Sequence, residues 1–97
     1  MENIKRFRQI TQDMANLYEK KNADYGNSFE QSLDEFGMVA GLVRIGDKFN
    51  RIKNIADVTN GVKYKPQVTD EALKDTLIDM ANYCIMLQMW LDKTDEQ

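Results

Sequence analysis

Apolar residues recur along this chain at the three- and four-residue spacing of amphipathic helices. In residues 2 to about 21 the apolar positions are Ile4, Phe7, Ile10, Met14, Leu17 and Tyr18. Similar runs cover residues 38–55 and residues 70–93. This spacing gathers the apolar side chains on one face of a helix, so the sequence predicts three long helices.

A short helix is predicted between the first two long ones. Residues 22–28 contain two asparagines and Gly26, which favour a turn. Ser28 followed by Gln31 has the pattern of a capping box, so we expect a helix from Phe29 to Phe36. Gly37 is well suited to end that helix.

The connector at residues 56–69 allows two interpretations. Asn60-Gly61, with valines on both sides, is typical of a hairpin turn, but a plain loop is also consistent with the sequence. Pro66 is predicted to keep the chain out of helix, and Thr69 is predicted to cap the third long helix.

The third long helix is apolar around much of its circumference. One stripe and the residues that widen it are Leu73, Leu77, Ile78, Met80, Cys84, Ile85, Met86, Leu87, Met89, Trp90 and Leu91. A helix of this kind needs neighbours on two sides, and a chain of 97 residues buries only a thin core. The sequence therefore predicts one all-α domain over residues 1–97, a small bundle completed by oligomerisation as a dimer or larger assembly. Cys84 is expected to be a small core residue.

Charge and composition narrow the chemistry. The net charge is −3, which argues against an extended nucleic-acid surface. The chain has no histidine, which excludes the usual zinc, copper and non-haem iron sites and Ser-His nucleophiles. No apolar run approaches the roughly 18 residues of a membrane span, and the single cysteine fits a reducing cytoplasm.

Three carboxylates form a column on the third long helix. Glu71, Asp75 and Asp79 stand four residues apart, and like charges at that spacing oppose helix formation by about 0.2–0.5 kcal/mol per pair. A bound Mg²⁺ would explain the column, with Asp47 from a facing helix as a further ligand. The alternative is a solvated acidic face.

Basic residues occupy one face of the second long helix. Arg44, Lys48 and Arg51 flank Asp47 at helical spacing, a pattern suited to phosphate oxygens. The alternative is ion pairing within the helix.

Aromatic and amide side chains are candidates for contacts to a base or sugar. Tyr25 and Phe29 offer flat faces, and Asn22 and Asn27 offer hydrogen bonds to a base edge. The alternative is a hydrophobic staple and ordinary turn chemistry. Asn82 and Tyr83 follow Asp79 by one turn and are candidates for the same role, while Tyr83 is as well suited to a half-buried core position.

Three stretches, at residues 21–29, 44–51 and 70–83, together resemble a phage and prophage family called nucleotide modification associated domain 1. The likeness runs from about residue 10 to residue 90. A more distant similarity is to all-α nucleoside triphosphate pyrophosphatases of the MazG and dimeric dUTPase type, which bind Mg²⁺ through E-x-x-E and E-x-x-D motifs. Asp47 and Asp75 match acids of those motifs, but Asn50 and Ala72 stand where the paired acids are expected.

The similarity to the all-α pyrophosphatases implies that this chain is a Mg²⁺-dependent nucleotide pyrophosphatase of a bacterial cytoplasm. It would cleave a standard or modified nucleoside triphosphate between the α- and β-phosphates. The metal ligands would be Asp47, Asp75 and Asp79, with Glu71 as a further ligand or as the base that orients water. Lys48 and Arg51 would neutralise the leaving pyrophosphate. Substrate contacts are assigned to Lys21, Asn22, Asp24, Tyr25, Phe29, Arg44, Asn82 and Tyr83.

Two other function classes remain. The departures from the acidic motifs favour a binding protein that sequesters a nucleotide signal of host defence, without metal or cleavage. A structural helical adaptor is the third alternative, and it leaves the acidic column unexplained.

Overall fold

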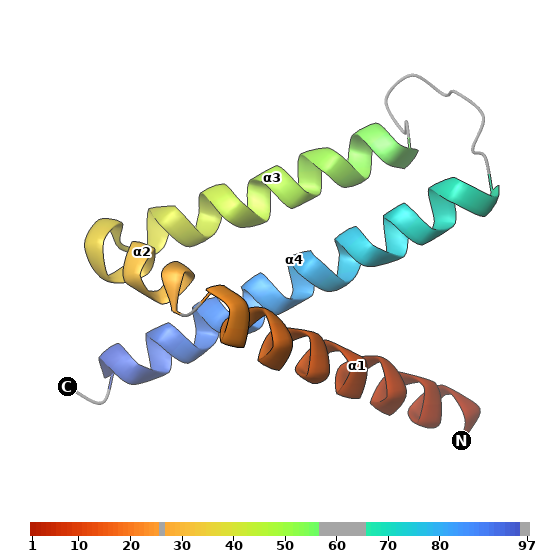
Figure 1. Cartoon of the computed structure of the whole chain (residues 1–97), viewed down its shortest axis with the longest axis horizontal. Coiled ribbons are helices and arrows are strands. Elements are labelled where there is room, and N and C mark those ends of the chain that lie inside the picture. Colours follow the sequence, from red (N-terminus) through yellow and green to blue (C-terminus); the bar gives the residue numbers. More distant parts are fainter. Residues whose placement is uncertain (26, 57–65, 96–97) are drawn as a thin grey trace.

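The computed structural model describes the backbone of residues 1–25, 27–56 and 66–95, and the side chains of residues 1–23, 27–56 and 71–94. Over these residues the chain forms four helices and no strand. They are α1 (Glu2–Tyr25), α2 (Ser28–Phe36), α3 (Met38–Ala56) and α4 (Pro66–Asp95) (Figure 1). The prediction of an all-α fold with three long helices and one short helix is confirmed.

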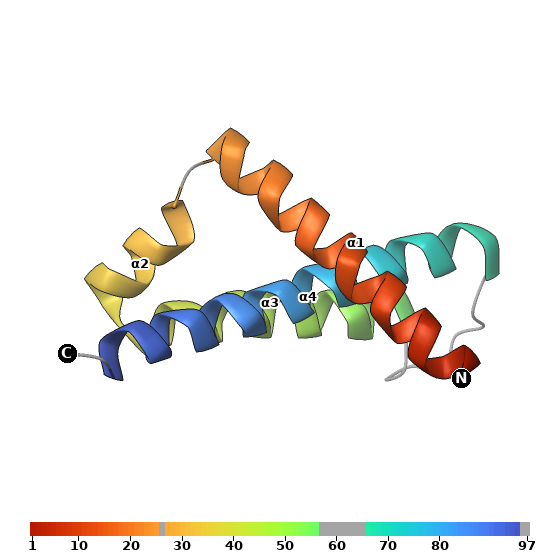
Figure 2. The same cartoon turned by 90° about the horizontal axis from the view of Figure 1, so that it is seen from below.

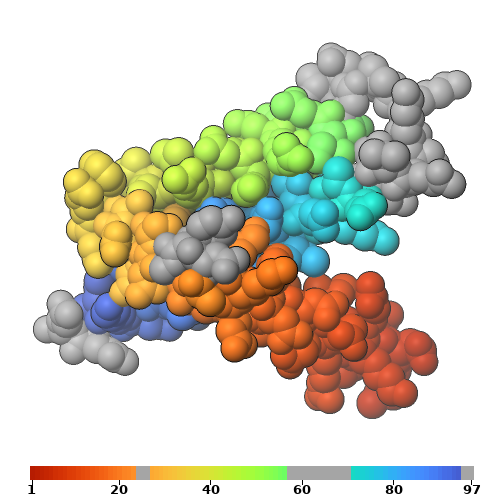
Figure 3. Space-filling model, viewed as in Figure 1, coloured from red at the N-terminus to blue at the C-terminus, as the bar shows by residue number. Residues whose placement is uncertain are grey.

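The two central helices, α3 and α4, pack side by side and antiparallel along much of their length (Figure 1). The helix α2 and the C-terminal half of α1 lie on the same side of this pair, whereas the N-terminal end of α1 descends to the level of the pair, as the perpendicular view shows (Figure 2). The N-terminal half of α1 points away from α3 and α4 and stands apart from them in the space-filling view (Figure 3). The fold is therefore two layers deep, with the second layer on one side only.

Three helices meet at a small glycine in the core. A Cβ atom on Gly41 of α3 would lie 3.0 Å from Leu87 Cδ1 of α4 and 3.3 Å from Leu33 Cδ2 of α2. Side chains of α2 and α4 therefore come close to the α3 backbone at Gly41, whereas a Cβ atom on Gly46 would have nothing within 4 Å. Among the described residues, the buried hydrophobic side chains are Met14, Leu33 and Leu87, so the core of one chain is small.

The turn predicted at residues 22–28 is wrong over most of its length, because α1 continues through Tyr25. Asparagine, alanine and aspartate at 22–24 do not stop a helix that is already formed, and Gly26 is the first strong helix breaker in the segment. This extension keeps Lys21 and Asn22 in regular helical register.

The predicted capping box of α2 is also wrong. Asn27 is the N-cap residue, it makes no side-chain capping bond, and Ser28 is the first helical residue. The backbone N–H of Gln31 donates to the Asn27 carbonyl at 2.9 Å. The predicted end of α2 is confirmed at Gly37, whose φ of 76° suits a residue without a Cβ.

The start of α4 lies earlier than predicted. Pro66 is its first residue, so the prediction that Pro66 excludes helix and that Thr69 is the cap is wrong. Proline is favoured in the first helical turn because its missing N–H has no partner there in any case. The hairpin-or-loop question at Asn60-Gly61 lies outside the described residues.

Cys84 is exposed in the single chain, so the prediction that it is a core residue is wrong for one copy of the molecule. Its neighbour Ile85 is exposed as well. The apolar circumference of α4 is therefore only partly covered by α1, α2 and α3.

Candidate functional site

A cavity of about 440 Å³ lies between α1, α2 and α4, on the covered side of the central pair. From α1 and α2 it is lined by Tyr18, Lys21, Asn22, Asn27, Ser28, Phe29, Glu30 and Leu33. From α4 it is lined by Asp79, Asn82, Tyr83, Met86, Met89, Trp90 and Lys93. The cavity follows α4 over about 21 Å, given a rise of about 1.5 Å per residue from Asp79 to Lys93.

The middle of the cavity is aromatic. The rings of Phe29 and Tyr83 meet edge to face, with centroids 4.9 Å apart and planes inclined by 67°. Tyr18 adds a third ring from α1, and Trp90 adds an indole from α4. Flat apolar surfaces of this kind are suited to stacking with a planar ring of a ligand.

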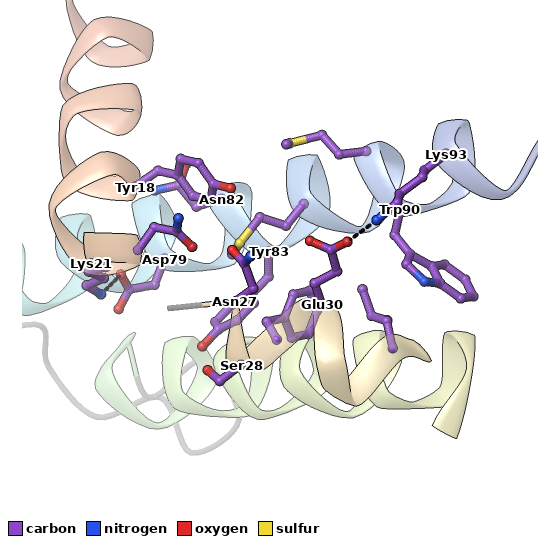
Figure 4. Close-up of a pocket in the computed structure, with 15 residues that line it drawn as sticks. Tyr18, Lys21, Asn27, Ser28, Glu30, Asp79, Asn82, Tyr83, Trp90 and Lys93 are labelled. Atoms are coloured by element: carbon purple, nitrogen blue, oxygen red, sulfur yellow. Dashed lines mark hydrogen bonds and ion pairs between the residues drawn. The ribbon is translucent and has the colours of Figure 1, made fainter. Parts of the chain in front are cut away.

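One end of the cavity carries a carboxylate held by two ammonium groups, of which Figure 4 shows that of Lys21. Lys21 Nζ of α1 lies 3.0 Å from Asp79 Oδ1, and Lys48 Nζ of α3 lies 3.5 Å from Asp79 Oδ2. The Asp79 side chain is 23 % exposed, Lys48 is 28 % exposed and Lys21 is 52 % exposed. Two cations from different helices thus converge on one anion at the mouth of the cavity.

At the opposite end of the cavity, a hydrogen bond and an ion pair join α2 to α4. Trp90 Nε1 donates to Asp34 Oδ1 at 2.9 Å, and Lys93 Nζ forms an ion pair with Glu30. The hydrogen bond to Glu30 and the charge of that carboxylate raise the pKa of Lys93 above its ordinary value of 10.5. These contacts fix the indole and the α2 helix at this end of the cavity.

A polar contact also joins α1 to α4 beside the aromatic wall. Asn82 Nδ2 donates to the backbone carbonyl of Met14 at 3.4 Å. Because Met14 is buried, this bond and its packing hold the middle of α1 against α4.

A second, open hollow runs along α3. It is lined by Asp47, Lys48, Asn50, Arg51, Asn54 and Ile55. Arg51 Nε donates to Thr76 Oγ1 of α4 at 3.2 Å, and Thr76 Oγ1 donates in turn to the Ala72 carbonyl at 2.8 Å. Lys48 connects this hollow to the cavity, since it lines the hollow and its ammonium group reaches Asp79.

The structure brings together only part of the predicted site. The cavity gathers Lys21, Asn22, Phe29, Asp79, Asn82 and Tyr83, and the open hollow gathers Asp47, Lys48 and Arg51. Three predicted residues, Arg44, Glu71 and Asp75, are exposed and line neither of these two spaces. The side chains of Asp24 and Tyr25 lie outside the described residues.

The acidic column does not form a ready ligand set within one chain. Over the described side chains, no group of three or more His, Cys, Asp or Glu residues stands close enough to hold a metal ion. Asp79 is the acid of the column that lines the cavity, and each of its oxygens faces a lysine. Its immediate partners are therefore ammonium groups from α1 and α3.

Several cavity residues were not predicted as site residues. Tyr18, Met86 and Trp90 line the cavity, although the sequence places them in apolar stripes. Glu30 and Lys93 also line it, and no sequence pattern singles them out. The sequence feature that could have identified the α4 residues is the large apolar fraction of the helix circumference, which the sequence analysis explains by packing alone. Part of that circumference lines the cavity.

Comparison with known proteins adds one match. The family model described as "Nucleotide modification associated domain 1" matches residues 21–91, which include every described residue of α2 and α3 and most of α4. Neither the comparison with curated proteins nor that with solved structures found a match. The distant likeness to all-α pyrophosphatases stays a prediction. No helix, in the part of the chain that the structure describes, is both long and apolar enough to cross a membrane.

Proposed function

The chain belongs to the nucleotide modification associated domain 1 family, and we propose that it binds a phosphorylated nucleotide in the cavity between α1, α2 and α4. The observation that carries this proposal is the convergence of Lys21 and Lys48 on one point at the cavity mouth. Two ammonium groups around one anion are what a phosphate group requires, and ammonium–phosphate hydrogen bonds are among the strong ones.

In the proposed complex the phosphates lie at the Lys21 end and the base lies among the rings. The distance along α4 from Asp79 to Tyr83 is about 6 Å, because four residues rise 1.5 Å each. A sugar beside Asn82 would join the two parts of the ligand. The edge-to-face pair of Phe29 and Tyr83, with Trp90 beyond it, offers the base a stacking surface.

The open hollow on α3 supplies a path for further phosphates. Lys48 lines the hollow and its ammonium group reaches Asp79 of the cavity lining, and Arg51 follows Lys48 by three residues on the same helix. Their charges support a ligand that carries more than one phosphate, because a second phosphate would lie within reach of Arg51. This argument favours nucleoside di- and triphosphates over monophosphates.

Binding without cleavage is the function that the geometry supports best. The Asp79 carboxylate is engaged by two lysines, and Glu71 and Asp75 stand outside both spaces. The residues present do not fit a complete magnesium site in one chain, so we derive no hydrolytic step through a metal. A protein of this kind would hold a nucleotide and keep it from other proteins.

Mg²⁺-dependent pyrophosphate release is the second candidate. It is supported by Asp47, whose carboxylate lines the open hollow beside Lys48 and Arg51. Mg²⁺ in phosphate sites usually keeps several waters and takes only one or two protein carboxylates together with phosphate oxygens. A metal arriving with the nucleotide would therefore need few ligands from this chain.

The experiment titrates the full chain with a panel of nucleoside mono-, di- and triphosphates, first in EDTA and then with Mg²⁺. The fluorescence of Trp90, the single tryptophan, reports occupancy of the cavity. Chromatography of the nucleotide after incubation separates binding from cleavage. Binding in EDTA with intact ligand supports the first candidate, and monophosphate plus pyrophosphate only with Mg²⁺ supports the second.

Two neighbouring lysines give a matched pair of variants. Lys21→Ala removes one ammonium from the cavity mouth, and we expect affinity to fall at least tenfold, since a hydrogen bond to a charged group contributes about 1.5–3 kcal/mol. Lys20→Ala makes the same change one residue away, at an exposed position outside the cavity lining, and affinity should stay the same. An equal loss in both variants would mean that only the net charge matters, and the proposed site would be wrong.

A further inference from the structure

The cavity is longer than an ordinary nucleotide. A phosphate bound by Lys21 and Lys48 would lie level with Asp79, and Trp90 and Lys93 line the cavity toward its other end (Figure 4). Along α4, Trp90 stands about 16 Å beyond Asp79 and Lys93 stands about 21 Å beyond it. Side chains of a helix all lean toward its N-terminus, so the Cβ atoms of these residues have the same spacing.

An unmodified nucleoside diphosphate ends before this part of the cavity. In ADP and in CDP, ten bonds lead from the α-phosphorus to the exocyclic amine of the base, and an extended chain advances about 1.2 Å per bond, so these atoms are at most about 12 Å apart. With its phosphates at the cavity mouth, the base reaches Phe29 and Tyr83. Its far edge stops before the level of Trp90, so the last part of the cavity is left for a further group.

The far end of the cavity, which we define as the part lined by Met86, Met89 and Trp90, is apolar. Trp90 is half-buried, and its indole N–H, the single donor of that side chain, donates to Asp34 Oδ1 at 2.9 Å. This bond holds the indole in one orientation and leaves ring surface for a ligand. Met89 is 49 % exposed, and methionine sulfur makes favourable contacts with aromatic rings. The far end is therefore suited to a planar apolar group.

The charges beside the far end disfavour an anion there. Lys93 forms an ion pair with Glu30, and Asp34 adds a second carboxylate through its bond to the indole. One ammonium group thus stands among two carboxylates, whereas at the cavity mouth two ammonium groups face one carboxylate. A second phosphate would be repelled at the far end, while an uncharged ring leaves the ion pair intact.

We propose that the ligand is a nucleotide whose base carries a planar apolar substituent on the edge away from the sugar, and that the far end binds this substituent. The inference rests on the proposed function, because it places the phosphates at Lys21 and Lys48. It adds the class of nucleotide, which is one enlarged at its base. A benzyl group on the exocyclic amine would lengthen the ligand by about 5 Å, which brings its ring level with the indole of Trp90.

Calorimetric titration of the full chain in EDTA tests the proposal with two series of ligands. One series is ADP, ADP with a methyl group on the exocyclic amine, and ADP with a benzyl group there, and the other is CDP with the same changes. The methyl group is too short to reach the indole, so it should leave the affinity unchanged. In the series whose base fits the cavity, the benzyl ligand should bind about tenfold more tightly than the methyl ligand, because its ring is buried and stacked.

Two variants locate the bound ring. Trp90→Leu keeps an apolar side chain and removes the flat ring, so the tenfold preference for benzyl over methyl should be lost, whatever the variant does to the affinity for the unmodified nucleotide. Phe36→Leu is the matched control, since Phe36 is 67 % exposed on α2 and lies outside the cavity lining. This control should keep the preference.

Three results overturn the inference. The first is binding of ADP or CDP with no gain from the benzyl group, which leaves the proposed function standing. The second is a preference that Trp90→Leu retains, because the ring would then bind elsewhere. The third is no binding in either series, after which the panel of unmodified nucleotides decides separately on the proposed function. If Trp90→Leu fails to fold, the fluorescence of Trp90 in wild type takes its place: the benzyl ligand should change it more than the methyl ligand does, and equal changes overturn the assignment.

Discussion

Replacing Asp79 by asparagine tests how the cavity mouth works. The Asp79 carboxylate forms ion pairs with both Lys21 and Lys48. A phosphate that binds these lysines must share them with Asp79 or replace it. Asp79→Asn keeps the shape of the side chain and removes its charge, so phosphate should bind more tightly to the variant.

The size of the effect follows from the distances. A phosphate oxygen in contact with the same ammonium groups would lie about 4 Å from the carboxylate, where two unit charges interact by about 1 kcal/mol in water and about 4 kcal/mol at an effective dielectric constant near 20. Asp79 is 23 % exposed, so it is screened less than a group in water and the repulsion lies between these two values. We expect the removal of about 1.4 kcal/mol of repulsion, a tenfold gain in affinity.

The same variant should lose little stability. The ion pair with Lys21 joins a lysine that is 52 % exposed, and such pairs contribute about 0.2–1 kcal/mol. Lys48 lies further from the carboxylate, at 3.5 Å, so its contact adds no more than that. We expect the free energy of unfolding to fall by about 1 kcal/mol.

The assay is a titration with inorganic tripolyphosphate in EDTA, followed by calorimetry or by Trp90 fluorescence. Tripolyphosphate has no base, so the measurement reports the phosphate end alone. Asp13→Asn is the control, because it makes the same charge change at an exposed position of α1 outside the cavity. Unchanged or weaker binding to Asp79→Asn would refute the argument. Weaker binding only with Mg²⁺ present would instead identify Asp79 as a metal ligand.

Two further predictions concern stability. Gly41→Ala should lower the free energy of unfolding by about 1–2 kcal/mol, because the new methyl group meets Leu87 at 3.0 Å and overpacking outweighs the gain of about 1 kcal/mol in helix propensity. Gly46→Ala meets nothing within 4 Å and should raise the free energy of unfolding, measured by urea titration, by about 1 kcal/mol; a loss would contradict the packing argument. The raised pKa of Lys93 means that its pair with Glu30 stabilises the fold below pH 10.5 and is lost as the pH rises through the folded-state pKa. Lys93→Met should therefore remove part of the alkaline fall in stability, and an identical pH profile in both chains would contradict this.

The sequence predicts the four helices because their apolar spacing repeats over many residues, so single exceptions do not disturb it. Helix ends depend on a few residues, and there the prediction fails. Proline disfavours the middle of a helix and favours its first turn, so Pro66 alone does not say on which side of the boundary it stands. The residues before Gly26 are weak helix formers that an existing helix tolerates.

Residues of the candidate site could be predicted only where they share one face of a single helix. The pattern on α4 singles out Asp79, Asn82 and Tyr83, and the structure places all three in the lining of the cavity. It could not show that Lys21 of α1 and Lys48 of α3 surround Asp79, because that depends on how three helices cross. Asp79 belongs to a column of acids in the sequence, but in the folded chain its ion-pair partners are Lys21 and Lys48.

Aromatic residues on α4 illustrate the opposite error. Trp90 follows the helical spacing of core residues, and spacing alone does not distinguish a buried side chain from one that lines a cavity. The distinction arises because α1 leans away from the central pair while α2 turns back onto it (Figure 2). The space between them is where the indole, held by Asp34, meets the cavity.

The position of Asp79 also links ligand binding to the attachment of α1. Within the described residues, α1 is held to α4 by Lys21 at one point and by Met14 and its bond from Asn82 at another. A ligand that draws Lys21 away from Asp79 removes the first attachment unless its own phosphate takes over the role of the carboxylate. A phosphate between Lys21 and Lys48 does so, because it keeps α1 tied to α3 through one anion. The cavity mouth is therefore suited to an anion that can take the place of the Asp79 carboxylate between the two lysines. This is a further reason to expect a phosphate there.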